Sequence, residues 1–483
     1  MTKSLGSGDL GIIAEVLEHV QLPFDGQPHQ YQIEDVNRGA REKSFGYFLG
    51  IGLGKTVVAA LTGGYKLLHG YDRCIVSCPA SLIEQWGEVL LKMGFDTLLY
   101  RGTPQERSRL GFDHDFIVMS FEIFQKDYER IVKYPAYHIV DEATILSNPD
   151  NKFFKMFNGS VTKKKVPVPG KLKPDIVTVA YPGVNEGCSL LTATPSNNPA
   201  GLYGLIKTLA PEIYVNEFQF NRLHVSEVDY FNAPVGFTNL DMLKSNLESV
   251  ASIRFSTDHL DLPERVLNVI EYDLDPEHYA IYKELVDTRL VINKDKIVIN
   301  AIEATTFYNW AQKIIVNPDK ASFKKECKGL SILDTIVRGN SQTLIVNKYV
   351  MSNQQMMERY KDIGVGGCFG GIPRGQQQQF IKAFQEKRLR VLTVNPKSGG
   401  TGLNLQVCHN VVFPEVPVTA RDYRQAEGRV YRQGQQNRVI VTLLIARRTI
   451  QKTLLKKIME KDDVMREVIH TPSSLRQDLF PND

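Results

Sequence analysis

Two short groups of residues, far apart in the chain, carry side chains suited to binding and cleaving a nucleotide. The first group is Gly52, Gly54, Lys55 and Thr56, a glycine-rich loop directly before a helix-forming run. In such a loop backbone N–H groups approach phosphate oxygens, the lysine binds the β- and γ-phosphates, and the threonine hydroxyl binds Mg²⁺. The generic pattern has one more glycine, at position 49, where this chain has leucine. The loop predicts a site for ATP and Mg²⁺.

The second group is the run at residues 425–432, which ends in two arginines. Arg429 and Arg432 are three residues apart, and at this spacing we expect them on one face of a helix. A guanidinium that reaches a γ-phosphate stabilises the charge of the transition state. The two groups together predict a two-lobed nucleic-acid motor, in which one lobe holds the nucleotide and the other reaches across to it.

Polar residues follow two apolar runs in the first half of the chain. Asp141 and Glu142 come directly after one run, where the aspartate can hold Mg²⁺ through water and the glutamate can polarise the attacking water. Residues 192–195, Thr-Ala-Thr-Pro, follow another run and can link the nucleotide state to lobe closure. Gln32 precedes the phosphate loop, and its amide can read adenine through two hydrogen bonds. Together these residues extend the predicted nucleotide site.

The second half of the chain has its own glycine-rich segment, at residues 398–405. Its glycines expose backbone N–H groups, which suit either a phosphodiester backbone or a γ-phosphate sensor. We expect Ser398, Gly399 and Asn404 to contact a nucleic-acid backbone and Gly402 to contact the nucleotide. Such contacts predict binding that does not depend on base sequence and weakens strongly with salt.

The elements that must position these residues are short β-branched runs alternating with helical stretches. The predicted strands are 73–77, 116–120, 138–140 and 189–192 in the first half, and 343–346, 391–394, 411–413 and 439–445 in the second. Buried parallel strands have this pattern, so we expect an α/β protein with two doubly wound parallel-sheet lobes. The predicted domains are 1–202, a mainly helical region at 203–335, 336–467, and a tail at 468–483, with a loop or hairpin inserted at about 150–188.

Composition limits the classes of protein that remain. The chain has 483 residues, 42% of them hydrophobic and 23% charged, with a net charge of +4. No apolar run approaches the roughly 20 residues that cross a bilayer, and the first nine residues do not resemble a secretory signal. The six cysteines have no common zinc spacing, so we expect buried or free thiols in an intracellular, cytoplasmic protein.

The motifs in this order resemble those of superfamily-two helicases, and among them the Swi/Snf-like DNA translocases. The resemblance runs from about residue 30 to 455 and is most specific in 399–405 and 425–435, which are similar to the family's GlNL and QaxGRxxRxGQ segments. It implies two RecA-like lobes with helical protrusions between them. It also implies an ATPase stimulated by DNA that moves along duplex or branched DNA in replication, recombination or repair.

The resemblance also gives individual residues a role. Residues 78–86 and 120–122 look like the family's DNA-contacting segments, which adds Pro79, Ala80 and Ser120 to the expected DNA contacts, and Thr194 is a further expected contact. Lys55 and Thr56 would bind phosphate and Mg²⁺, with Asp141 orienting the ion and Glu142 acting as the base. Gln32 would contact adenine, and Arg429 and Arg432 would be arginine fingers. These roles remain expectations at this point.

One departure from the family pattern leaves alternatives open. Thr144 stands where the family has histidine, which weakens the expected coupling between hydrolysis and DNA binding. A strand-separating or branch-migrating helicase is one alternative, with residues 150–188 as its wedge. A nucleotide-gated DNA-binding scaffold with little turnover is the other.

Overall fold

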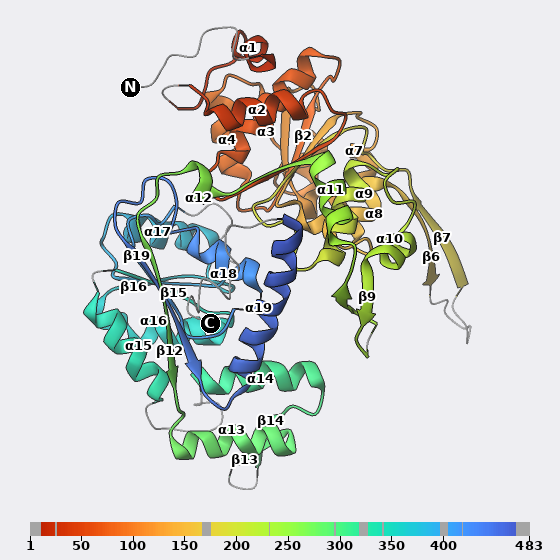
Figure 1. Ribbon diagram of the computed structural model, residues 1–483. Coiled ribbons are helices and arrows are strands. Elements are labelled where there is room, and N and C mark those ends of the chain that lie inside the picture. The colour runs from red at the N-terminus through yellow and green to blue at the C-terminus, as the bar shows by residue number, and fades with distance from the viewer. Residues whose placement is uncertain are drawn as a thin grey trace. The chain divides into compact units, whose positions relative to one another are not determined.

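The computed structural model describes residues 11–24, 27–166, 175–230, 232–293, 296–317, 327–340, 342–396, 404–417 and 419–469. The chain forms two compact units, with the boundary between His259 and Leu260. Each unit is built around its own parallel sheet (Figure 1). The two α/β lobes expected from the sequence are thus confirmed.

The sheet of the first unit has seven strands in the order β11-β1-β8-β5-β2-β4-β3, and every neighbouring pair is parallel. Its strands are β1 (Phe45–Leu49), β2 (Cys74–Cys78), β3 (Thr97–Leu99), β4 (Phe116–Ser120), β5 (Tyr137–Asp141), β8 (Cys188–Leu191) and β11 (Ala251–Arg254). The strands β1, β2, β4, β5 and β8 are buried along their whole length. Continuous apolar runs take this place because helices cover both faces of a parallel sheet.

Helices of the first unit place the chemistry-bearing loops at one edge of this sheet. The helices that follow β1 and β2 are α3 (Lys55–Leu68) and α4 (Ile83–Lys92), and α2 (Gln30–Gly39) precedes β1. Helix α3 packs against both α2 and α4, and the three lie together near β2 in Figure 1. Because the strands are parallel, the loops that leave β1, β2, β5 and β8 all start at the carboxyl edge of the sheet.

The segment predicted as an insertion contains a helix and a hairpin. Helix α8 (Lys152–Asn158) is followed by the antiparallel strands β6 (Ser160–Val166) and β7 (Asp175–Tyr181), with Ser160 opposite Tyr181. Figure 1 shows β6 and β7 projecting from the first unit as a pair of strands. The candidate wedge of a strand-separating helicase is therefore a hairpin and not an irregular loop.

The sheet of the second unit has six parallel strands in the order β12-β19-β18-β15-β17-β16. Its strands are β12 (Arg265–Tyr272), β15 (Thr343–Val346), β16 (Val365–Cys368), β17 (Val391–Val394), β18 (Asn410–Phe413) and β19 (Val439–Ala446). One apolar core contains Leu392, Val411 and Val441, and another contains Ile345, Val412 and Leu444. Neighbouring residues of β15, β18 and β19 thus point into different cores, as the two-residue period of a strand requires.

Helices complete the second unit. They include α13 (Pro276–Thr288), α14 (Ala304–Val316), α15 (Lys328–Gly339), α16 (Val350–Arg359), α17 (Arg374–Gln385), α18 (Ala420–Glu427) and α19 (Ile450–Ile469). Helices α16 and α17 pack on β16 and β17. Pro276 is the first residue of α13, as expected from its fixed φ and missing N–H.

The eight strands predicted from apolar runs are confirmed, with ends that differ by at most one residue. Region 203–335, expected to be a mainly helical segment between two lobes, also contributes one strand to each of the two large sheets. Strand β11 pairs with β1 in the first unit, and β12 pairs with β19 in the second. Helix α13 ends at Thr288, where Arg289 takes a left-handed conformation before the strand β13 (Leu290–Asn293).

Candidate nucleotide site and nucleic-acid interface

The glycine-rich loop joins the end of β1 to the start of α3. Gly52 and Gly54 have positive φ angles of 87° and 75°, a region that glycine enters without steric cost. A Cβ atom at Gly54 would also lie 2.4 Å from Nε2 of Gln32. The loop therefore requires glycine at this position, and it directs the amino end of α3 toward the carboxyl edge of the sheet. Helix amino ends attract anions because their N–H groups are unpaired and their dipole is positive.

Lys55 is the first residue of α3 and turns back over the loop. Its Nζ atom donates hydrogen bonds to the carbonyl oxygens of Leu49, at 2.9 Å, and Gly50, at 3.2 Å. Burial raises the pKa of Asp141, and the positive charge of Lys55 offsets a part of that rise. The loop lysine and the carboxylate after β5, which are 86 residues apart in sequence, thus interact electrostatically in the first unit.

Asp141 is a buried carboxylate, and Glu142 directly after it forms a strained turn. Asp141 is 7% exposed, and burial together with the charge of Glu142 raises its pKa to about 6. Glu142 has a φ of 55°, an unusual value for a residue with a Cβ. Its N–H donates to Oδ1 of Asp141 at 2.8 Å. Backbone strain of this kind is found at functional sites, which supports a chemical role for this turn.

Trp86 is the residue of this site that sequence reasoning did not single out. It lies in α4, is 1% exposed, and its Nε1–H donates a hydrogen bond of 2.9 Å to Oδ2 of Asp141. A buried indole N–H needs an acceptor, so the sequence indicated that Trp86 has a partner. It did not indicate which one, because α4 and β5 are separated by about 50 residues.

Gln32 supports the phosphate loop from α2. Its Nε2 donates to the carbonyl of Leu53 at 3.2 Å, and its Oε1 accepts from the backbone N–H of His29 at 2.9 Å. The hydroxyl of Tyr31 donates to the same Leu53 carbonyl at 3.3 Å. The amide predicted to read adenine is therefore next to the phosphate loop, with both of its ends hydrogen-bonded. Its contact with adenine stays a prediction.

The expected DNA contacts of the first unit differ in their surroundings. Pro79 and Ala80 are half-buried in the turn after β2. Ser120 is buried, and its hydroxyl caps a helix by accepting from the N–H of Ile123 at 3.3 Å. Thr194 has a buried hydroxyl for which no hydrogen-bond partner occurs among the described residues. The structure thus shows a capping role for Ser120, while DNA contact stays a prediction for all four.

The glycine-rich segment of the second unit is mostly outside the described residues. Ser398, Gly399 and Gly402 lie in the gap at 397–403, so their predicted contacts are not addressed by the structure. Asn404 is described and exposed, and its carbonyl accepts a hydrogen bond of 2.7 Å from Nε2 of Gln385. Asn404 therefore remains accessible for the predicted backbone contact.

The two arginines do not lie on one helical face, contrary to the expectation from their spacing. Helix α18 ends at Glu427, and Arg429 and Arg432 follow it in a turn. In this turn the carbonyl of Arg429 accepts a hydrogen bond of 2.9 Å from the N–H of Leu405. Arg429 is buried, and its Nη2 donates to the carbonyl of Pro396 at 2.8 Å. The turn holds Arg429 against the loop that leaves β17.

Buried charge fixes α18 to the edge strand β12. Glu427 is buried and pairs with Arg265 at 3.2 Å, and the hydroxyl of Tyr423 donates to it at 3.3 Å. Arg424 of the same helix pairs with Asp462 of α19 at 3.0 Å. These contacts hold the end of α18, and with it the start of the arginine turn, at a defined place in the second unit.

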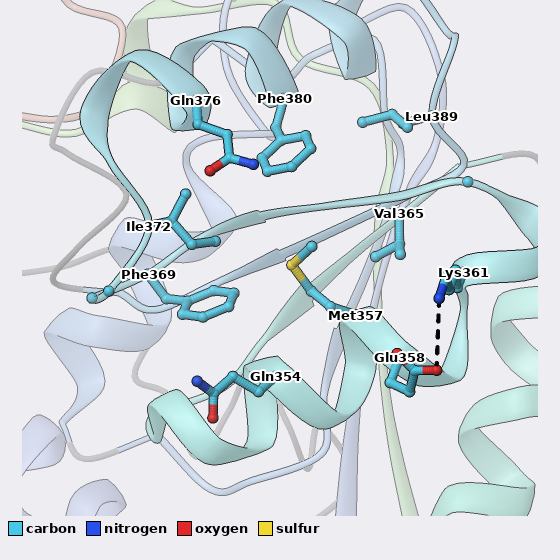
Figure 2. Close-up of a pocket in the computed structure, with 13 residues that line it drawn as sticks. Gln354, Met357, Glu358, Lys361, Val365, Phe369, Ile372, Gln376, Phe380 and Leu389 are labelled. Carbon is cyan, nitrogen blue, oxygen red and sulfur yellow. Dashed lines mark ion pairs between the residues drawn. The ribbon is translucent and has the colours of Figure 1, made fainter.

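A cavity of about 560 Å³ lies elsewhere in the second unit, between α16, β16 and α17. Figure 2 shows Met357, Val365 and Phe380 pointing into it, with Glu358 and Lys361 paired with each other at its rim. None of the predicted site residues lines this cavity. Its partly apolar wall and the paired charges at its rim are unsuited to a triphosphate, so the phosphate loop stays the predicted nucleotide site.

The described parts of the chain lack the features of disulfide, metal-cluster and membrane-spanning sites. All six cysteines are buried and free of disulfides, as expected. Within the described ranges, no three His, Cys, Asp or Glu side chains are grouped so as to hold a metal ion. None of the helices in those ranges has both the length and the apolar character needed to cross a membrane.

Two family models match the chain, one in each unit. An SNF2-related domain matches residues 48–170, and a helicase conserved C-terminal domain matches residues 328–434. The first range begins in β1 and includes the phosphate loop and the Asp141–Glu142 turn, and the second ends just after the arginine turn. The chain belongs to the Swi/Snf-like helicases of superfamily two. It is accordingly a DNA-dependent ATPase by enzyme class.

Curated proteins of similar sequence include two that are described as ATP-dependent helicases. This Swi/Snf-like helicase is 22% identical to an uncharacterised ATP-dependent helicase, YqhH, of Bacillus subtilis, over 87% of this chain and 75% of that protein. It is 24% identical to an uncharacterised ATP-dependent helicase of Mycoplasma pneumoniae, over 94% of this chain and 43% of that protein. The nuclear protein STH1/NPS1 of Saccharomyces cerevisiae is 23% identical, and 33% of its length is matched. The chain thus spans less than half of the last two relatives.

A solved structure was also found to be similar. It is the SWI2/SNF2 ATPase core of Sulfolobus solfataricus in complex with double-stranded DNA. The sequence identity is 20%, the TM-score is 0.42, and the alignment covers 92% of this chain and 96% of that one.

Proposed function

We propose that this protein is an ATP-driven motor that moves along duplex or branched DNA without reading its base sequence. The observation that carries the proposal is the turn after β5, where Asp141 is buried, Glu142 has a left-handed backbone, and the charge of Lys55 in the phosphate loop acts on Asp141. This arrangement brings a phosphate-binding lysine and two carboxylates to one edge of the first sheet. We place the motor in DNA replication, recombination or repair.

In the first unit, some residues bind the phosphates and another activates the attacking water. Lys55 and the N–H groups at the start of α3 bind the β- and γ-phosphates, because both carry positive charge toward that edge. Glu142 accepts the proton of the attacking water and orients it toward the γ-phosphate. Its left-handed backbone turns it away from the direction of β5, so its side chain does not continue the strand.

Magnesium fits the residues present. The hydroxyl of Thr56 and the carboxylate of Asp141 are oxygen ligands of the kind that Mg²⁺ prefers, with substrate phosphates and water completing its shell. Burial and the neighbouring Glu142 disfavour the negative charge on Asp141, and a bound cation offsets that cost. When bound, the ion neutralises charge that develops on the phosphates.

The second unit supplies the arginines. Arg429 and Arg432 would reach the γ-phosphate when the two lobes close, and so make hydrolysis depend on closure. Burial lowers the pKa of Arg432 from its usual value, although a guanidinium stays charged at neutral pH. Closing on ATP and opening after hydrolysis would move the two lobes in turn along the DNA backbone.

Contacts with the DNA backbone would come from Pro79, Ala80 and Thr194 in the first unit and from Asn404 in the second. Pro79 and Ala80 are partly accessible, Asn404 is exposed, and Thr194 has a buried hydroxyl without a partner among the described residues. Contacts of this type carry no base information. The affinity for DNA should therefore fall steeply as salt concentration rises.

The test is the steady-state ATPase rate at one fixed salt concentration, without nucleic acid and with single-stranded DNA, duplex DNA, forked DNA or RNA. Stimulation mainly by duplex DNA supports the proposal, and no stimulation by any of them contradicts it. Lys55→Ala should abolish turnover and leave the fold intact, as judged by its circular dichroism spectrum. A Lys55→Ala variant with a normal rate would show that the nucleotide site is assigned wrongly.

Strand separation is the second candidate function, because the insertion contains the projecting hairpin of β6 and β7. Replacing residues 160–181 by a short Gly-Ser linker distinguishes the two functions. Loss of fork unwinding with retained duplex-stimulated ATPase would identify the hairpin as a wedge. Unchanged unwinding would remove it from that role.

A further inference from the structure

A continuous series of hydrogen bonds joins the turn after β2 to the predicted catalytic carboxylates. The N–H of Leu82 donates to the carbonyl of Pro79 at 2.8 Å, and the N–H of Trp86 donates to the carbonyl of Leu82 at 2.9 Å. The indole of Trp86 then donates to Asp141 at 2.9 Å, and Asp141 accepts the N–H of Glu142 at 2.8 Å. The series thus runs from the surface turn, through the first turn of α4, into the nucleotide site.

Burial makes the middle of this series rigid. Leu82, Trp86 and Asp141 are all buried, while Pro79 and Ala80 are partly accessible. The indole N–H is the only polar group of its side chain, so Trp86 has one strong hydrogen bond to make. A bond between a buried donor and an ionisable acceptor is costly to leave unmade. A shift of the start of α4 would therefore displace Asp141 rather than simply break the bond.

We propose that Trp86 is a positioning residue that transmits DNA contact at Pro79 and Ala80 to Asp141 and Glu142. DNA that binds this turn would change the position of α4. The indole would then move Asp141, and with it Glu142, into the position for hydrolysis. Trp86 is 1% exposed and therefore acts through Asp141. The inference rests on the proposed function and gives a physical route for stimulation of the ATPase by DNA. Spatial contact alone does not establish coupling, so the test must measure coupling itself.

The first experiment compares Trp86→Phe with Trp310→Phe. Phenylalanine keeps an apolar ring and removes the N–H, and the chain's only other tryptophan, Trp310, lies in α14 of the second unit. We expect Trp86→Phe to reduce the ratio of DNA-stimulated to DNA-free kcat about 5- to 10-fold, the lower range for coupling between sites. DNA affinity should change less than the ratio. Trp310→Phe should keep the ratio of the wild-type protein.

The possible results separate the inference from the proposed function. A wild-type protein whose ATPase is not stimulated by DNA overturns both. A stimulated wild-type protein whose ratio is unchanged in Trp86→Phe overturns the inference alone. Equal losses with and without DNA in Trp86→Phe would also overturn it, because they would show a purely structural role for the indole.

A second measurement does not depend on activity. With ¹⁵N-labelled tryptophan the wild-type protein has two indole N–H signals, and Trp310→Phe identifies the one from Trp86. We expect duplex DNA, added without nucleotide, to shift the Trp86 signal, and Asp141→Asn to shift it in the absence of DNA. A Trp86 signal that stays in place at saturating DNA would overturn the inference.

Discussion

Gly54→Ala tests whether the phosphate loop is fixed by its contact with Gln32. In the structure Gly54 has a φ of 75°, and an added Cβ would lie 2.4 Å from Nε2 of Gln32. The Gln32 side chain would have to move, which would break its 3.2 Å hydrogen bond to the carbonyl of Leu53. The substitution therefore combines backbone strain with the loss of one buried hydrogen bond.

The expected size follows from these two costs. A residue with a Cβ in the left-handed region costs about 1–2 kcal/mol, and a buried hydrogen bond contributes about 1 kcal/mol. Gly54→Ala should thus lower the free energy of unfolding of the first unit by about 2–3 kcal/mol. It should also raise the KM for ATP, because the displaced loop no longer directs its N–H groups at the phosphates.

The assay is urea unfolding followed by tryptophan emission, in a Trp310→Phe background, so that Trp86 alone reports the first unit. Gly94→Ala is the matched control, because Gly94 has a φ of 91° and no atom within 4 Å of its added Cβ. This control should show the strain alone, about 1–2 kcal/mol. The difference between the two variants, about 1 kcal/mol, measures the contact with Gln32.

The double variant Gln32→Ala with Gly54→Ala tests whether the contact with Gln32 causes the extra loss of stability in Gly54→Ala. If the contact is real, the effect of Gly54→Ala should shrink to that of Gly94→Ala once Gln32 is removed. Equal effects of Gly54→Ala and Gly94→Ala in the original background would show that the contact contributes nothing. An unchanged KM for ATP would show that the loop does not need this conformation to bind nucleotide.

Two further predictions concern buried charge. In the folded protein the pKa of Asp141 is raised to about 6. Its ionisation therefore lowers the free energy of unfolding as the pH rises from the pKa of the unfolded chain through 6. Asp141→Asn should stabilise the first unit by up to about 3 kcal/mol at pH 8, and by less at pH 5. Urea unfolding at both pH values in Mg²⁺-free buffer checks this, and a larger gain at pH 5 would contradict it. Arg265→Ala should destabilise the second unit by about 3 kcal/mol because it leaves Glu427 buried with its charge less compensated. Arg438→Ala, which breaks an exposed 3.0 Å pair with Glu264, should cost under about 1 kcal/mol, and Trp310 emission in a Trp86→Phe background measures both.

Much of the site was predictable because it consists of local patterns. The run Phe45–Leu49 followed by a glycine-rich loop and a helix-forming segment encodes its own geometry, since glycine conformations and helix starts depend on neighbouring residues. The carboxylates Asp141 and Glu142 follow a buried strand in the same local way. Parallel strands then bring both groups to one edge of the sheet.

The arginine turn shows where local reasoning failed. The spacing of Arg429 and Arg432 fits a helix, yet α18 ends at Glu427. The hydrogen bond between the Arg429 carbonyl and Leu405 links two segments of the second unit and competes with continuation of the helix. Such a contact is not visible in a window of neighbouring residues, because tertiary pairing overrides helix propensity.

The sequence by itself thus determined the apolar strands, the phosphate loop, the carboxylates and the arginines, because each of these features is a pattern of neighbouring residues. Only the tertiary structure decided that β11 joins the first sheet and β12 the second, and that Gln32 supports Leu53 while Trp86 holds Asp141. Gly46 pairs with Ala251, about 200 residues away, and a short strand has no local signal for its partner. Buried donors such as the Trp86 indole likewise take the acceptor that packing brings to them, because leaving the group unpaired costs more than any local preference.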